Sequence, residues 1–245
     1  MSNNLNLDSQ PKKLIIFDFD GVIGDTIYQA YLATNEVLEK YDLQAFDTPE
    51  EFYEDLNVTL AVAPKLIWNR IKKHGFFGGF LGIIKHLTAL SKIKANLMFA
   101  FGPKLIAATY FVGIPDVLEK LQGQAEMVIV SNNQKDGINK FLEKNNLAKY
   151  FTEVHGFEKT MVKTGKLKKI MESRKTELAN VIFITDMARD VNDANPLKLR
   201  CLAVTYGYNN LQKLQTRNPA KIIDRVDQIL PALKTMLFLE NRKDL

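Results

Sequence analysis

Two aspartates one residue apart follow a short apolar run near the start of the chain. The run covers residues 14–17 and continues as Asp18, Phe19, Asp20 and Gly21. A few β-prone residues bounded by a breaker predict a buried strand. Because side chains alternate along a strand, both carboxylates are expected to point to one side. Carboxylates are costly to bury alone, so this pair indicates an ion pair or a metal site, although an ordinary Asp-Gly turn explains it equally well.

Four further polar residues stand near the ends or starts of predicted elements. Ser131 ends a second apolar run, Asp186 ends a third with Asp190 four residues on, and Lys163 stands just before a predicted helix. Together these groups are of the kind that a phosphoryl site needs. Each alone is a weak signal, because Ser131 and Asp186 could cap helices and Lys163 is one of five lysines within residues 159–169. Their agreement across several strand ends is the argument.

The elements that would position these groups alternate between strand and helix after residue 113. We expect strands at 14–17, 127–130, 153–155, 181–184 and 201–205, helices at 115–121, 134–145, 166–173 and 189–194, and a helical tail near residue 231. Such alternation predicts an α/β fold with a Rossmann-like parallel sheet and right-handed crossovers. Ligands of such sheets bind beyond the carboxyl ends of the strands, where the polar groups stand.

A long segment between the first and second strands has a different character. Residues 26–110 are predicted to form an all-helical inserted cap, with no β pattern, between core segments 1–25 and 111–245. Its first helix is expected at residues 26–40, with Asp25 as the N-cap. A second helix is expected to begin at Thr48, because Pro49 and Glu51 stand where a capped helix start favours them.

Composition limits the classes of protein that need to be considered. The chain has 245 residues, 46% of them hydrophobic, and a net charge of +5. The single cysteine, Cys201, lies in an apolar run and is expected to be buried, and no secretory signal is evident, so we expect a cytoplasmic protein. Residues 56–115 contain eight Lys or Arg and no acid. That segment suits an anionic small substrate or a solvated face. No nucleic-acid motif accompanies the charge, so nucleic acid is not expected as a partner.

The apolar, basic segment also raises the question of a membrane. Its longest stretches without a charged residue, 74–84 and 105–115, have eleven residues each, short of the roughly 20 that a span needs. A membrane span is therefore not expected. Core packing of the cap or self-association into a homo-oligomer accounts for the apolar residues better.

The motifs together resemble the haloacid dehalogenase-like hydrolase superfamily, in its branch with a helical cap, which includes phosphoglycolate phosphatase-like proteins. The resemblance runs from Leu14 to about Tyr208, and its most specific part is residues 18–22. The sequence departs from the pattern at Thr185, where many members have glycine, and at Thr164, where proline often follows the motif lysine.

The resemblance implies a Mg²⁺-dependent phosphatase that acts on a small anionic phosphorylated metabolite through an aspartyl-phosphate. Asp18 would be the nucleophile and Asp20 the general acid and base. Mg²⁺ would be held by Asp18, the backbone carbonyl of Asp20 and Asp186.

The remaining motif positions are assigned to binding. Ser131, Asn132 and Gly21 would bind the phosphoryl group, and Lys163, with Lys166 as the fallback, would offset its charge. Asp190 would act behind them by orienting the lysine or a metal-bound water.

Five alternative functions are weighed, of which the first two stay open. A phosphomutase keeps both aspartates, and a phosphonate hydrolase would use a cap lysine. A dehalogenase is disfavoured because relatives with that activity lack the second aspartate. A non-enzymatic adaptor that binds a membrane or a partner through the cap is disfavoured by the full set of reacting groups. A signalling receiver domain is rejected because its phosphorylated aspartate follows a later strand.

Overall fold

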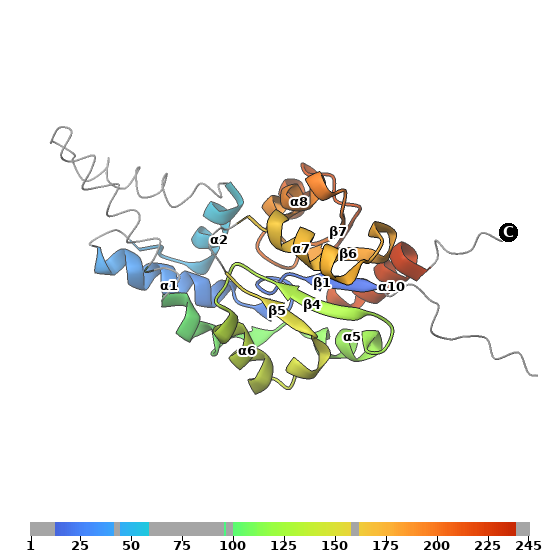
Figure 1. The fold of residues 1–245 in the computed structure, drawn as a ribbon. Helices are drawn as coiled ribbons and strands as arrows, with labels where there is room; N and C mark the ends of the chain where they lie inside the picture. The colour runs from blue at the N-terminus through green and yellow to red at the C-terminus, as the bar shows by residue number, and fades with distance from the viewer. Residues whose placement is uncertain (1–12, 42–44, 59–95, 97–99, 158–161, 239–245) are drawn as a thin grey trace, which may run out of the picture.

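The protein is organised around a six-stranded parallel sheet, seen in a computed structural model that describes residues 13–41, 45–58, 96, 100–157 and 162–238 (Figure 1). The strand order is β5-β4-β1-β6-β7-β8, with β1 inside the sheet. The strands are β1 Leu14–Phe17, β4 Glu126–Val130, β5 Glu153–His155, β6 Val181–Thr185, β7 Arg200–Val204 and β8 Lys221–Ile223. Leu14 pairs with Glu126 on one side and with Val181 on the other. The predicted parallel core is confirmed, and β8 is an added strand within the segment predicted to be a helical tail.

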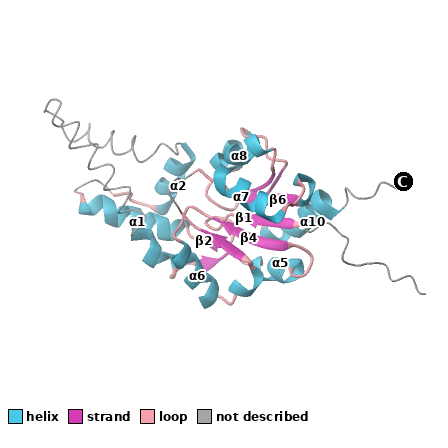
Figure 2. Cartoon of the chain, viewed as in Figure 1, coloured by secondary structure: helices cyan, strands magenta, loops and turns pink. Residues whose placement is uncertain are grey.

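Helices cover both faces of this sheet, because alternate residues of the strands point to opposite sides (Figures 1 and 2). Ile15 and Phe17 face one core cluster, and Leu14 and Ile16 face the other. The first cluster is shared with α5 Ile114–Leu121, α6 Lys135–Lys144 and α10 Ile229–Leu233, and the second with α7 Thr164–Arg174 and α8 Ala188–Ala194. A short helix, α9 Leu211–Gln215, follows β7. Cys201 is buried in the second cluster, as predicted.

The inserted segment leaves and rejoins the core through a small antiparallel pair. β2 Gly24–Asp25 pairs with β3 Thr109–Tyr110, which the sequence prediction missed because two-residue strands carry no apolar periodicity. Between them lie α1 Ile27–Lys40, α2 Pro49–Val58 and a helical turn at residues 100–105. Residues 59–95 lie outside the described part, so the division into core and all-helical cap stays a prediction.

Of the two predicted helix starts in this segment, the first is wrong and the second is confirmed. The N-cap of α1 is Thr26 and not Asp25, because the Thr26 side chain is buried toward the core while Asp25 is exposed in β2. At α2 the prediction is confirmed, since the Glu51 backbone N–H donates to the Thr48 hydroxyl over 3.1 Å.

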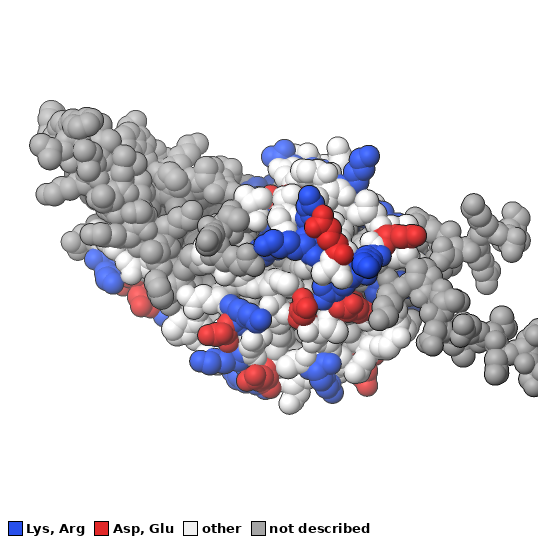
Figure 3. Space-filling view, viewed as in Figure 1, with Lys and Arg blue, Asp and Glu red and all other residues white. Residues whose placement is uncertain are grey.

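The surface of the core carries mixed charge. On the face drawn in Figure 3, Lys and Arg alternate with Asp and Glu, and neither sign forms a continuous area outside the grey atoms. Within the described ranges, no helix has both the length and the apolar character that crossing a bilayer requires.

Candidate active site

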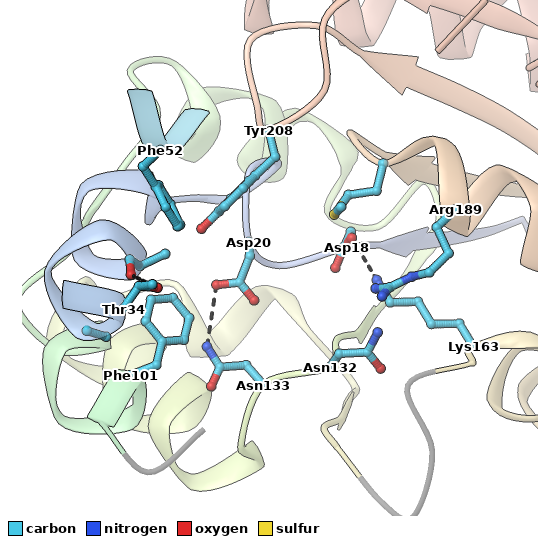
Figure 4. Close-up of a pocket in the computed structure, with 13 residues that line it drawn as sticks. Asp18, Asp20, Thr34, Phe52, Phe101, Asn132, Asn133, Lys163, Arg189 and Tyr208 are labelled. Atoms are coloured by element: carbon cyan, nitrogen blue, oxygen red, sulfur yellow. Dashed lines mark hydrogen bonds and ion pairs between the residues drawn. The ribbon is translucent and has the colours of Figure 1, made fainter. Parts of the chain in front are cut away.

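The predicted site residues meet at the carboxyl ends of the central strands, beside a cavity of about 270 Å³ (Figure 4). Asp18 and Asp20 follow β1 and line this cavity with Lys163 and Asn132. The Asp18 backbone N–H still donates to the Ile184 carbonyl of β6 over 2.8 Å, so the first aspartate extends the sheet. A second hollow, of about 440 Å³ beside α1 and α2, is lined by none of the predicted residues.

Lys163 lies between two carboxylates at this edge. Its Nζ is 2.6 Å from Asp18 Oδ2 and 2.6 Å from Asp190 Oδ2, and all three side chains are buried. Burial would lower the pKa of Lys163, but the two carboxylates outweigh it and raise the pKa above its usual value. Burial would likewise raise the pKa of Asp190, yet Lys163 holds that pKa at about 2. The ion pairs therefore keep the lysine charged and aimed at Asp18.

The choice between Lys163 and Lys166 follows from how α7 begins. The Lys163 backbone N–H donates to Asp193 of α8 over 2.7 Å, and the Thr164 hydroxyl donates to the Asp193 carbonyl over 2.7 Å. These contacts anchor the start of α7 and place Lys163 at the cavity. Lys166 is also buried, but its Nζ donates to the backbone carbonyls of Ser131 at 2.7 Å and Gly156 at 3.0 Å. Thr164 thus supplies an anchor at the position where the family often has proline.

Asp20 is held by hydrogen-bond donors and not by a direct ion pair. Its Oδ1 accepts from the hydroxyl of Thr26 at 3.0 Å and from the Asn133 amide at 3.4 Å, and its Oδ2 accepts from Ser131 at 3.2 Å. Burial raises the pKa of Asp20, and these donors, led by Thr26, oppose the rise. Thr26 also shares a 2.9 Å hydrogen bond with the Tyr208 hydroxyl, which fixes its position.

Asp186 lies behind Asp18 and is completely buried. Its Oδ2 accepts from the Tyr208 backbone N–H over 2.6 Å. Gly21 has φ +76°, and a Cβ atom added there would overlap the Asp186 carboxylate and the Tyr208 ring. Gly207 packs against the same carboxylate. The glycine after Asp20 therefore makes room for Asp186, and it does not line the cavity.

The residues at this edge fit a divalent cation. Asp186 Oδ1 is buried without a hydrogen-bond partner among the described residues. The carboxyl groups outnumber the cationic side chains, with Asp18, Asp20, Asp186 and Asp190 against Lys163 and Arg189. Burial, together with the charges of Asp190 and Asp186, raises the pKa of Asp18 well above its usual range. A cation beside Asp18 and Asp186 would offset the excess negative charge and favour the ionised form of Asp18.

A Mg²⁺ site of this kind needs fewer protein side chains than a site built entirely from protein ligands. In the described part of the chain, no three His, Cys, Asp or Glu side chains are grouped as metal ligands. Mg²⁺ keeps several waters and is commonly bound through one or two carboxylates. Asp18, Asp186 and the backbone carbonyl of Asp20 suffice for such a site.

The cavity also contains residues that the sequence analysis did not select. Arg189, Tyr208 and Asn133 line it, and Thr26 and Thr185 support it from behind. The Thr185 hydroxyl donates to Asp190 Oδ2 over 3.1 Å. Thr185 and Arg189 lie within the recognised motif at 185–190, so proximity to it was the available signal. Tyr208 is brought in by the turn after β7, which no local pattern in the sequence indicates.

Most of the basic segment of the cap lies outside the described residues, including Lys85, Lys92 and Lys94. Lys104 is described, and its Nζ lies 2.6 Å from Glu36 of α1. Lys104 does not line the cavity. The expectation that these lysines meet an anionic substrate stays a prediction for the first three and is not supported for Lys104.

Comparison with known proteins relates this arrangement to one family. A family model described as haloacid dehalogenase-like hydrolase matches residues 15–204. The phosphoglycolate phosphatase of Synechococcus elongatus is 24% identical over 227 residues, which cover 91% of this chain and 98% of that protein. Phosphoglycolate phosphatase 1 of Pseudomonas aeruginosa is 23% identical, over 89% of this chain and 79% of that protein.

Solved structures share the fold. A crystal structure from Haemophilus somnus, described as a predicted phosphoglycolate phosphatase, aligns with a TM-score of 0.72 at 18% identity. The alignment covers 91% of this chain and 99% of that one. The shared architecture therefore extends over nearly the whole length of both chains.

Proposed function

The chain belongs to the haloacid dehalogenase-like hydrolase family, and we propose that it is a Mg²⁺-dependent phosphatase that hydrolyses a small phosphomonoester. In this proposal Asp18 is the nucleophile and Asp20 the general acid and base. The two relatives named as phosphoglycolate phosphatases support the reaction class. Their identity to this chain is too low to assign the substrate.

One observation carries the proposal: two carboxyl groups share the cavity but have different surroundings. Asp18 lies 2.6 Å from the Lys163 ammonium, while Asp20 accepts hydrogen bonds from the neutral side chains of Thr26, Ser131 and Asn133. Burial raises the pKa of both carboxyl groups, so the direct counter-ion of Asp18 is what distinguishes them. A carboxylate must be ionised to act as a nucleophile, whereas a carboxyl group must carry a proton to protonate a leaving group. Environments that distinguish two neighbouring carboxyl groups in this way support separate roles for them.

The proposed steps balance with these two residues alone. Asp18 Oδ forms a bond to phosphorus as the bond from phosphorus to the ester oxygen breaks. The Asp20 carboxyl gives its proton to that oxygen, and the alcohol leaves. Asp20, now ionised, takes a proton from water, whose oxygen attacks phosphorus and releases inorganic phosphate. Asp18 is then free, and Asp20 is protonated again.

Other groups at the cavity would hold the phosphoryl oxygens during both steps. The Ser131 hydroxyl now donates to Asp20 at 3.2 Å and could turn to a phosphoryl oxygen, and Asn132 lines the cavity beside it. The Lys163 ammonium lies where it would stabilise negative charge that develops near Asp18. Asp190 would keep this ammonium in place through its 2.6 Å ion pair.

Asp18, Asp186 and the backbone carbonyl of Asp20 would hold Mg²⁺ in this proposal. When bound, the cation would offset charge on the phosphoryl group and on the two carboxylates. The unpartnered Oδ1 of Asp186 supports this assignment.

The test is phosphate release from p-nitrophenyl phosphate with Mg²⁺ and with EDTA, for wild type, Asp18→Asn and Asp116→Asn. Asp116 is exposed on α5, so Asp116→Asn makes the same chemical change away from the cavity. The proposal expects release that needs Mg²⁺, falls at least about a thousandfold in Asp18→Asn, and is unchanged in Asp116→Asn. Wild-type turnover that survives in Asp18→Asn would rule out Asp18 as the nucleophile.

A further inference from the structure

The cavity has two ends of different character. The acidic and cationic groups, Asp18, Lys163 and Arg189, lie at one end (Figure 4). The opposite wall comes from the inserted segment, with Phe52 and Phe101 as its labelled rings. The described residues of this wall are Ala30, Ala33, Thr34, Phe52 and Phe101, and none of them carries a charge. If the phosphoryl group lies at Asp18, the wall faces the rest of the substrate.

The polar groups near this wall are already engaged. The Thr34 hydroxyl donates to the Ala30 carbonyl within α1 over 2.7 Å, so its hydrogen is used by the helix. The Asn35 amide pairs with the backbone of Phe46 through bonds of 2.8 and 2.9 Å. The described part of the wall is therefore mainly aliphatic and aromatic.

The aromatic part of the wall is held in place by its own packing. The Phe52 ring lies 5.3 Å from Phe46 and 6.2 Å from Tyr31, measured between ring centroids. Phe52 is 6% exposed and belongs to a buried cluster with Leu38. Such packing fixes the ring, so the wall is a preformed apolar surface.

The cations of the cavity lie at its other end. Lys163 lies between Asp18 and Asp190, and Arg189 Nε is 3.6 Å from Asp190 Oδ1, an ion pair without a hydrogen bond. Lys104, a cation of the inserted segment, pairs with Glu36 and does not line the cavity. Among the described lining residues, none offers a positive charge to a second anionic group at the wall.

We infer that the ester group of the substrate is compact and uncharged, an alkyl or aryl group that packs against this wall. The inference rests on the proposed function only in placing the phosphoryl group at Asp18. A carboxylate at the wall would lose its water without gaining a partner, whereas an apolar group gains from the same burial. A cavity of about 270 Å³ suits a small ester. Phosphoglycolate, whose ester group ends in a carboxylate, is a poor match.

The test compares two esters of nearly equal shape, isobutyl phosphate and phosphoglycolate, in which two methyl groups replace the two carboxylate oxygens. We expect wild-type kcat/KM to be at least about tenfold higher for isobutyl phosphate. Ala30→Lys adds a cation to the wall and should lower this ratio about tenfold or more. Gln29→Lys adds the same charge at the neighbouring residue, which does not line the cavity, and should leave the ratio within about twofold. Thr34→Lys replaces Ala30→Lys if the latter fails to fold.

Binding of both esters to Asp18→Asn, measured by calorimetry with Mg²⁺ present, separates this inference from the proposed function. Turnover that depends on Asp18 but favours phosphoglycolate overturns the inference and leaves the proposed function standing. Absence of Asp18-dependent turnover for both esters overturns the proposed function. The inference is then supported by tighter binding of isobutyl phosphate, and overturned by tighter binding of phosphoglycolate or by no binding of either.

Discussion

Replacement of Asp186 by asparagine is expected to stabilise the metal-free protein, although Asp186 is completely buried at the centre of the site. One of its oxygens accepts from the Tyr208 backbone N–H at 2.6 Å, and the other has no partner in the described part of the chain. Asparagine keeps the shape and the acceptor oxygen but carries no charge. The substitution therefore removes a buried negative charge and keeps the hydrogen bond to Tyr208.

The size and sign of the effect follow from the pKa of this group. Burial is the main cause that raises the pKa of Asp186 from 3.8 to about 7. The folded protein thus binds more protons than the unfolded chain between these values, and its stability falls as the pH rises through that window. At about 1.4 kcal/mol for each pH unit, the penalty reaches about 4 kcal/mol above pH 7 and about 2 kcal/mol at pH 5.

The assay is urea unfolding in EDTA at pH 8 and pH 5. Asp186→Asn should raise the free energy of unfolding by up to about 4 kcal/mol at pH 8 and by about half of that at pH 5. Added Mg²⁺ should stabilise wild type and have little effect on Asp186→Asn. Asp190→Asn is the matched control with the opposite sign. Because Lys163 holds the pKa of Asp190 at about 2 despite burial, its loss should cost about 2 kcal/mol at pH 8.

Two results would refute this reasoning. An Asp186→Asn protein that is less stable than wild type in EDTA at pH 8 would mean that the carboxylate is stabilised by contacts other than a cation. Equal stabilisation of wild type and Asp186→Asn by Mg²⁺ would place the cation elsewhere.

Three further substitutions test the contacts around Asp18 and Asp20, the two carboxyl groups proposed to be catalytic. Lys163→Met leaves buried carboxylates without a counter-ion, so we expect a loss of about 3–5 kcal/mol at pH 7 and a smaller loss at pH 4 in urea unfolding. Lys166→Met should cost about 3 kcal/mol by the same measurement, because the Ser131 carbonyl and a second buried carbonyl lose their donor. Thr26→Val removes a donor that lowers the pKa of Asp20. The alkaline limb of the kcat/KM profile should therefore move to higher pH, and an unmoved limb would exclude Asp20 as the acid.

The sheet was predictable where its strands are long and apolar. Residues 14–17, 127–130 and 181–184 are continuous buried runs, and each lies in a strand within one residue of its predicted limits. The strands that were missed are short: β2 and β3 have two residues each, and β8 has three. A strand of two residues has no periodicity to detect, and its pairing is decided by the chain segments brought beside it. Of the two strands with three residues, β5 was predicted at 153–155, where Gly156 ends the run, whereas β8 was not.

The site was predictable to the level of its motif residues but not of its supports. The sequence favoured Lys163 with Lys166 as the fallback, because both lysines lie near the predicted start of one helix. The anchoring of α7 on Asp193 places Lys163, and not Lys166, beside Asp18, and that contact spans 30 residues. Tyr208 reaches the site from the far end of the chain, with a hydrogen bond to Thr26 across 182 residues. Such supports depend on tertiary packing, which local patterns do not encode.

The most direct test of the central claim is the mass of the protein quenched in acid during turnover of p-nitrophenyl phosphate with Mg²⁺. Asp20→Asn should be included, because loss of the base slows hydrolysis of the intermediate. The account predicts one added phosphoryl group, located on the peptide that contains Asp18, released by base and absent from Asp18→Asn. Turnover with no phosphorylated protein in either form, or with the group on another residue, would contradict the proposed mechanism.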